Sequence, residues 1–145
     1  MKYWALLIPI LLSACGKPLP KGTWPVSVDT QVQYHLQIYG GDTSGLTIEY
    51  EELEPNILGY CLQHSNGMKE IQIDPVKWNT LQEGTRQVLI SHELGHCLEN
   101  MEHRDGRKNG YYTSIMNTYI LPLGMYLKKQ SFYESEFLSK VWEGS

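Results

Sequence analysis

The sequence predicts an α+β domain built around one small sheet. A helical repeat comes first, three short strand patterns follow it, and two further helical patterns come after the strands. A run of strands with helices before and after it is typical of an α+β fold. The chain has 145 residues, enough for one domain with a modest core.

The first predicted element is an amphipathic helix. Val28, Val32, Leu36 and Tyr39 recur at intervals of about four residues, which is the spacing of one helix face. Gly40-Gly41 follows directly and is typical of a helix end.

Three short strands are expected next, at residues 46–50, 57–62 and 68–73. The last two are separated by His64-Ser65-Asn66-Gly67, in which Asn-Gly is a strong tight-turn signal. These two strands should therefore form an antiparallel hairpin.

A long helix should follow the hairpin. Asp74-Pro75 ends the third strand, and Thr80 with Glu83 has the spacing of a capping box. The helix is expected to reach about Glu99. Gly95 inside it costs about 1 kcal/mol relative to Ala, which indicates that a close packing contact requires it.

The rest of the chain should hold a loop and one more helix. Residues 100–110 are polar and contain glycine, as is usual for a loop. A C-terminal helix is expected from Ser131, with Glu134 completing a second capping box and Phe132 and Phe137 facing the core.

The segment His92-Glu93-Leu94-Gly95-His96 indicates a zinc site. On a helix, His92 and His96 leave the same face, so both imidazoles can reach one ion at about 2.0–2.1 Å. Glu93 lies beside this pair, where a carboxylate can take a proton from a zinc-bound water. We therefore predict Zn²⁺ as cofactor and Glu93 as the catalytic base.

Three residues are candidates for the third ligand: Glu102, His103 and Asp105. A chain that turns back toward its own metal needs a left-handed residue at the helix end, and Asn100 suits that conformation after glycine. His103 follows three residues later and would complete a three-histidine site. We predict His103, with Glu102 and Asp105 as alternatives.

These motifs together resemble the metzincin clan of zinc endopeptidases. Members carry H-E-x-x-H-x-x-G-x-x-H and then a tight turn with a methionine beneath the metal. Ser114-Ile115-Met116-Asn117 resembles that Met-turn, and the likeness spans residues 56–119. Here Glu99 occupies the glycine position and His103 comes one residue late, so the strict count falls on Glu102.

The resemblance implies a minimal zincin-like fold: a small mixed sheet with an edge hairpin, the active-site helix, a Met-turn at Met116 and a C-terminal helix. It implies a metalloendopeptidase that hydrolyses peptide bonds by a Glu-activated, zinc-bound water, with the peptide added along strand 57–62. Tyr119 lies one residue beyond the position of a metzincin tyrosine, which makes a catalytic role doubtful. The alternatives are a non-catalytic zinc-binding envelope lipoprotein and a zinc amidase acting on cell-wall peptides.

The N-terminal residues indicate export and lipidation. Met1-Lys2 precedes an apolar run that is shorter than the ~20 residues needed to span a bilayer. The run ends at Leu12-Ser13-Ala14-Cys15, which resembles a bacterial lipoprotein signal. We expect residues 1–14 to be a signal peptide, residues 15–25 a tether after lipidated Cys15, and residues 26–145 the catalytic domain. The chain would be held on a membrane facing outside the cytoplasm, the outer membrane where two exist.

The cysteines and the charge of the chain support the remaining predictions, which concern a disulfide and the partners. Outside the cytoplasm Cys61 and Cys97 can form a disulfide, although two buried thiols are an equal alternative. The net charge is −4, and the 12 Lys and Arg residues are scattered along the sequence. We expect no nucleic-acid partner and a monomer.

Overall fold

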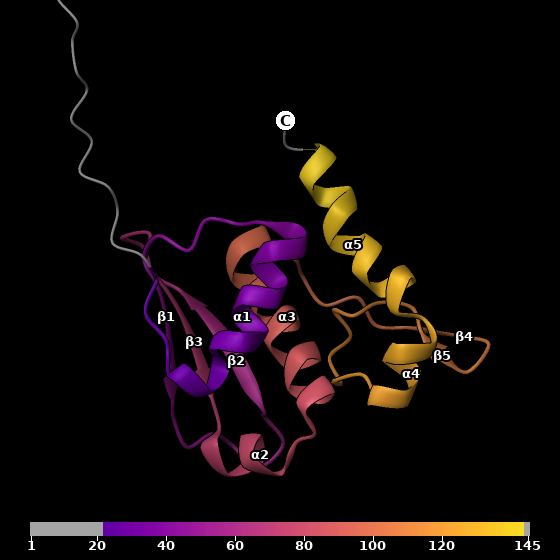
Figure 1. The fold of residues 1–145 in the computed structure, drawn as a ribbon, viewed down its shortest axis with the longest axis horizontal. Helices are drawn as coiled ribbons and strands as arrows, with labels where there is room; N and C mark the ends of the chain where they lie inside the picture. Colours follow the sequence, from indigo (N-terminus) through magenta and orange to yellow (C-terminus); the bar gives the residue numbers. More distant parts are fainter. Residues whose placement is uncertain (1–21, 144–145) are drawn as a thin grey trace, which may run out of the picture.

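A computed structural model describes residues 22–143 as an α+β domain with five helices and a three-stranded mixed sheet (Figure 1). The larger elements are α1 (Val26–Tyr39), β1 (Leu46–Tyr50), β2 (Gly59–Gln63), β3 (Lys69–Ile73), α2 (Pro75–Thr80), α3 (Glu83–Glu99), α4 (Leu123–Lys128) and α5 (Gln130–Glu143). Two-residue strands β4 (Arg107–Lys108) and β5 (Tyr111–Tyr112) form a separate hairpin. The predicted signal peptide, Cys15 and residues 15–21 of the predicted tether lie outside the described residues. Within these residues no helix is long and apolar enough to cross a bilayer.

The sheet has the order β1-β3-β2, so β2 is an edge strand. β1 runs parallel to β3, and β2 pairs antiparallel with β3 through a turn in which Gly67 has φ +83°. The predicted edge hairpin is therefore confirmed. The strand begins two residues later than expected, at Gly59. Before it, the chain is held as a loop by the Lys77 ammonium, which donates to the carbonyl oxygens of Leu53, Glu54 and Ile57.

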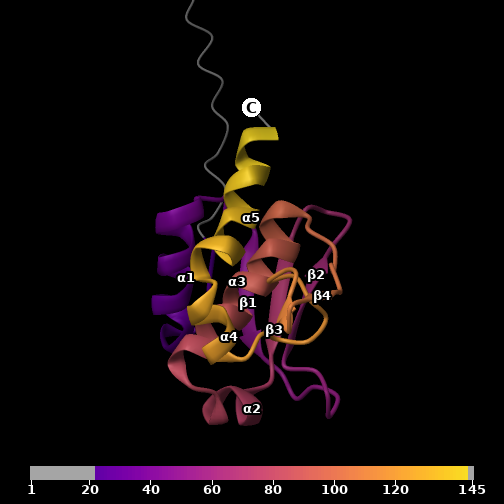
Figure 2. The ribbon, with the colours of Figure 1, turned by 90° about the vertical axis from the view of Figure 1, so that its right-hand side faces the viewer.

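Helix α3 lies between two hydrophobic clusters. One cluster joins α1, the sheet and one side of α3, and includes Val32, Ile71 and Leu94. The other joins α3 to the chain that follows it and includes Met116 and Phe137. In Figures 1 and 2, α4 and α5 pack against α3 on the side away from the sheet. We call residues 22–100 the sheet region and residues 101–143 the loop region.

The predicted start of the central helix is wrong. Residues 75–80 form the separate helix α2, whose N-terminus is capped by Asp74 through a bond from the Lys77 N–H. The Thr80 hydroxyl donates to the Lys77 carbonyl within that helix, and α3 begins only at Glu83, so Thr80 does not cap α3. Gln82 precedes α3 without a side-chain cap. Trp78 of α2 is buried in the core, and this burial stabilises the extra helical turn against the local capping preference.

The C-terminal helix also differs from the prediction. It begins at Gln130, so Ser131 lies inside it, and α4 precedes it. Glu134 does not cap a helix; its carboxylate accepts bonds from the Tyr34 and Tyr126 hydroxyls and from the Gln130 amide. Phe137 is buried as expected, whereas Phe132 is half exposed.

Candidate metal centre

Two histidines on α3 point their ring nitrogens at each other. His92 and His96 lie one turn apart, and their Nε2 atoms are separated by 3.1 Å. His92 is buried and His96 is half-buried. Gly95 between them is required by packing, as predicted, because a Cβ there would lie 2.8 Å from the sulfur of Met116 and 3.0 Å from the ring of Phe137.

The helix ends at Asn100 in the left-handed conformation that the sequence predicted. Asn100 has φ 51° and ψ 34°, and the next N–H, that of Met101, donates to the Gly95 carbonyl at 3.0 Å. The chain reverses here and brings His103 back beneath α3. The His103 Nε2 lies 3.3 Å from that of His92. The three histidines offer ligand atoms that all lie within 4.8 Å of one another.

Backbone carbonyls fix the orientation of two of the imidazoles. The Nδ1 of His92 donates to the Ile115 carbonyl at 2.9 Å, and the Nδ1 of His96 donates to the Met101 carbonyl at 2.6 Å. A neutral imidazole that donates through Nδ1 has a lone pair on Nε2. Both lone pairs therefore face the space that His103 also faces.

This donor set fits a metal ion. Neutral nitrogen lone pairs at such short separations repel one another unless a cation lies between them. Tetrahedral bonding at 2.0–2.1 Å places ligand nitrogens roughly 3.3 Å apart, close to the observed 3.1 and 3.3 Å. Burial lowers the pKa of His92 to about 4 and also lowers the pKa of His96, so these two rings are neutral at pH 7. The cluster can hold a metal ion.

Neither of the two alternative third ligands, Glu102 and Asp105, belongs to the histidine cluster. The Asp105 carboxylate accepts bonds from the N–H and the hydroxyl of Thr118 at 2.8 and 2.9 Å, and these bonds lower its pKa. Glu102 lines the same cavity as the histidines but is not part of their cluster. The geometry thus brings His103, and neither carboxylate, to His92 and His96.

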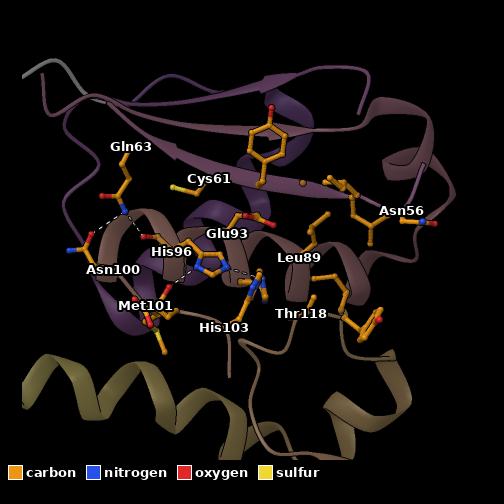
Figure 3. Close-up of a pocket in the computed structure, with 18 residues that line it drawn as sticks. Asn56, Cys61, Gln63, Leu89, Glu93, His96, Asn100, Met101, His103 and Thr118 are labelled. Atoms are coloured by element: carbon orange, nitrogen blue, oxygen red, sulfur yellow. Dashed lines mark hydrogen bonds between the residues drawn. The ribbon is translucent and has the colours of Figure 1, made fainter. Parts of the chain in front are cut away.

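Glu93 lies beside the histidine cluster on the wall of the same cavity (Figure 3). It is 3% exposed, and its Oε2 has no hydrogen-bond partner among the described residues. Burial raises the pKa of Glu93 to about 8. A cation held by the adjacent histidines would instead favour the ionised carboxylate.

The space in front of Glu93 depends on Gly59 of β2. A Cβ at Gly59 would lie 3.4 Å from the Glu93 Oε1 and 3.0 Å from the Gln72 carbonyl. The structure therefore places the Glu93 carboxylate directly against this glycine.

The cavity in front of these groups has a volume of about 860 Å³. Edge strand β2 and residues 56–58 before it form one wall, and α3, residues 100–103 and residues 118–120 form the others. In Figure 3 His96 and His103 lie in the middle, with Asn56 and Leu89 toward one end and Gln63 and Asn100 toward the other. Tyr119 also lines the cavity and is 71% exposed.

Two links attach β2 to the end of α3. Cys61 and Cys97 are joined in a disulfide with their Cα atoms 5.6 Å apart. The Gln63 amide donates to the His96 carbonyl at 2.9 Å and to the Asn100 side chain at 3.1 Å (Figure 3). Sequence reasoning missed Gln63, since a glutamine at a strand end carries no signal of its partners.

Met116 lies directly beneath the helix that carries the histidines. It is fully buried, with its sulfur against Gly95. The Met116 N–H donates to the Ser114 hydroxyl, which donates in turn to the Glu136 carboxylate. The Met116 carbonyl accepts the Arg104 N–H at 2.8 Å. The tight turn around Met116 is thus tied to the segment that carries His103.

Comparison of the sequence with models of known protein families and with curated proteins found no match.

Proposed function

We propose that this chain is a zinc-dependent metalloendopeptidase. The observation that carries the proposal is the convergence of three histidine Nε2 atoms with a buried carboxylate beside them on one cavity wall. His92, His96 and His103 would hold the ion. Three protein ligands leave one position of a tetrahedral ion open, whereas structural zinc sites use four.

When bound, zinc would supply a Lewis acid that polarises a carbonyl and lowers the pKa of a water. Glu93 is the group positioned to accept the proton of that water and to deliver it to the leaving amine. Its unpartnered Oε2 has no competing donor among the described residues. Burial also keeps bulk water from this carboxylate, which strengthens its interaction with a nearby cation.

The substrate would bind as an extra strand on β2. Leu58 and His64 hydrogen-bond to the β3 side of the hairpin, at Asp74 and Met68. Since the direction of bonding alternates along an antiparallel pair, Gly59, Cys61 and Gln63 direct their backbone groups to the free edge. An extended peptide can pair with these groups while its backbone passes the histidine cluster.

Membrane attachment through Cys15 and a location in the cell envelope also belong to the proposal. The sequence of the lipoprotein-like signal supports them. Labelling cells with a radioactive fatty acid should label the wild-type chain and not a Cys15→Ser variant.

The central test separates catalysis from metal binding. Glu93→Gln should reduce hydrolysis of a peptide library by at least a thousandfold, since it removes the base, while zinc stays stoichiometric by elemental analysis. Glu93→Asp is the control that keeps the charge and should retain partial activity. Loss of zinc in Glu93→Gln would instead assign Glu93 to the metal.

The third ligand has its own test. His103→Ala should weaken zinc binding by at least a hundredfold in a chelator competition, whereas Glu102→Ala should change it less than twofold. The reverse order would assign Glu102. Stoichiometric zinc without hydrolysis of any peptide would favour a zinc-binding lipoprotein, and release of cell-wall peptides alone would favour an amidase.

A further inference from the structure

Four of the nine Lys and Arg residues within residues 22–143 lie near one another in the fold, although they belong to two separate segments of the chain. Residues 22–103 hold twelve acidic and three basic residues. Residues 104–133 hold five basic residues and one acid, Asp105, whose carboxylate is engaged by Thr118. Glu134 follows directly, and its carboxylate accepts bonds from Tyr34, Tyr126 and Gln130. The β4–β5 hairpin and the junction of α4 with α5 carry four of the five basic residues, on the side of the molecule away from β1 (Figure 1).

A pocket of about 280 Å³ opens at this junction. We call it the tyrosine pocket. Its walls include Lys108, Tyr111, Tyr112, Lys129, Phe132 and Tyr133, and it shares no lining residue with the metal cavity. The Tyr133 hydroxyl donates to the Tyr112 carbonyl at 2.9 Å, which attaches α5 to the hairpin and holds the pocket in shape.

The cations of this surface lie against aromatic rings and not against acids. The Lys129 ammonium is 5.3 Å from the centre of the Tyr111 ring, and the Arg107 guanidinium is 4.5 Å from that of Tyr112. The ion pairs found among residues 22–143 involve neither Lys108 nor Lys129. Glu136, near Tyr133, accepts the Ser114 hydroxyl and does not line the pocket.

We propose that the tyrosine pocket binds an acidic peptide segment that carries an aromatic side chain. The half-exposed Phe132 and the Tyr111 ring offer a face for that side chain, and Lys108 and Lys129 offer charge-assisted bonds to the flanking carboxylates. The pocket volume suits one large side chain. Its concave shape suits a discrete group better than a flat bilayer. The proposal does not depend on catalysis at the metal centre.

Fluorescence anisotropy of a labelled peptide tests this proposal with the full chain. The probe has one phenylalanine with two glutamates on each side. Lys129→Ala should weaken its binding about fivefold, because it removes one cation of the pocket. Lys108→Ala should act similarly. Lys128→Ala is the matched control: it removes the same charge from an exposed neighbour that does not line the pocket, and it should change binding less than twofold.

Two altered probes and one variant identify the chemistry. Replacing the glutamates by glutamines, or the phenylalanine by alanine, should each weaken binding at least fivefold. Tyr111→Leu keeps every charge and should also weaken it. If Lys128→Ala and Lys129→Ala weakened peptide binding equally, the overall positive charge of this surface would explain binding and the proposal would be overturned. Binding of the chain to anionic lipid vesicles but not to the peptide would also overturn it. Concentration-dependent self-association of the chain would assign the pocket to a second copy and also overturn it.

Discussion

The sheet region and the loop region build the candidate metal centre by different means. In the sheet region, a strand ladder and a 17-residue helix set the positions of His92, Glu93 and His96. In the loop region, residues 113–122 contain no helix or strand, and single side-chain bonds such as those of Ser114 and Asp105 hold the turns. The sheet region thus sets the positions of His92 and His96, and the loop region sets the orientation of their rings.

The largest loss of unfolding free energy is expected at the junction of the sheet region with the loop region. Phe137 of α5 is buried against His35 and Tyr39 of α1, with ring centres 5.0 and 4.9 Å away, and it also contacts Gly95. Phe137→Ala should lower the free energy of unfolding by about 4 kcal/mol, measured by urea titration. Phe132→Ala, at a half-exposed position on the same helix, is the control and should cost less than about 1 kcal/mol. Equal effects would mean that α5 does not join the regions.

Removal of the disulfide should cause the second-largest loss of unfolding free energy. Cys61 and Cys97 are 36 residues apart in sequence, so their bond restricts a large loop of the unfolded chain. Replacing both by alanine should lower the free energy of unfolding by about 3–4 kcal/mol. A phosphine reductant should produce a similar loss in the wild type and none in the double variant. Unchanged stability in both tests would show that Gln63 and packing suffice to hold β2 on α3.

Acid should weaken the packing of α1 on α3 through His35. Its Nε2 is buried and has no hydrogen-bond partner within residues 22–143, and burial lowers the pKa of His35 to about 4 from an ordinary value near 6.5. The unfolded chain therefore takes up this proton first, so stability present above pH 6.5 is lost as the pH falls toward 4. The loss should be about 3 kcal/mol. In His35→Leu the unfolding free energy should fall less over this range, and an identical pH profile would contradict the assignment.

Replacement of Gln63 should cause the smallest loss of stability among these variants. Gln63→Ala removes two bonds between β2 and the end of α3, and should cost about 1 kcal/mol of stability and at most about fivefold in zinc affinity. Gln33→Ala, on the exposed face of α1, should change neither. A hundredfold loss of zinc in Gln63→Ala would make this glutamine, and not the helix, the main support of the His103 turn.

Local residue preferences explain why much of the sheet region could be predicted. The helix ending at Gly40, the Asn-Gly hairpin and the left-handed Asn100 each follow from local residue preferences. The position of His103 near the other histidines follows from Asn100, because that residue reverses the chain. Local capping rules failed at Thr80, where burial of Trp78 created α2.

The loop region resisted prediction because its order comes from distant partners. The strands of the β4–β5 hairpin are two residues long, too short for an alternating pattern. The carboxylate of Glu134 is held by Tyr34, one hundred positions away in sequence. The gathering of Lys108 and Lys129 likewise depends on how α5 packs on the hairpin, which no local pattern encodes.

The hydrogen bonds from the histidine Nδ1 atoms to the Ile115 and Met101 carbonyls have a thermodynamic consequence. Both acceptors belong to the loop region, so any ion that selects these ring orientations also selects the docked loop region. Metal binding and docking are then linked equilibria, each tightening the other. Each tenfold rise in free zinc above its dissociation constant should add about 1.4 kcal/mol to the stability of the folded chain. Ambient zinc would thereby set the fraction of molecules whose cleft is assembled.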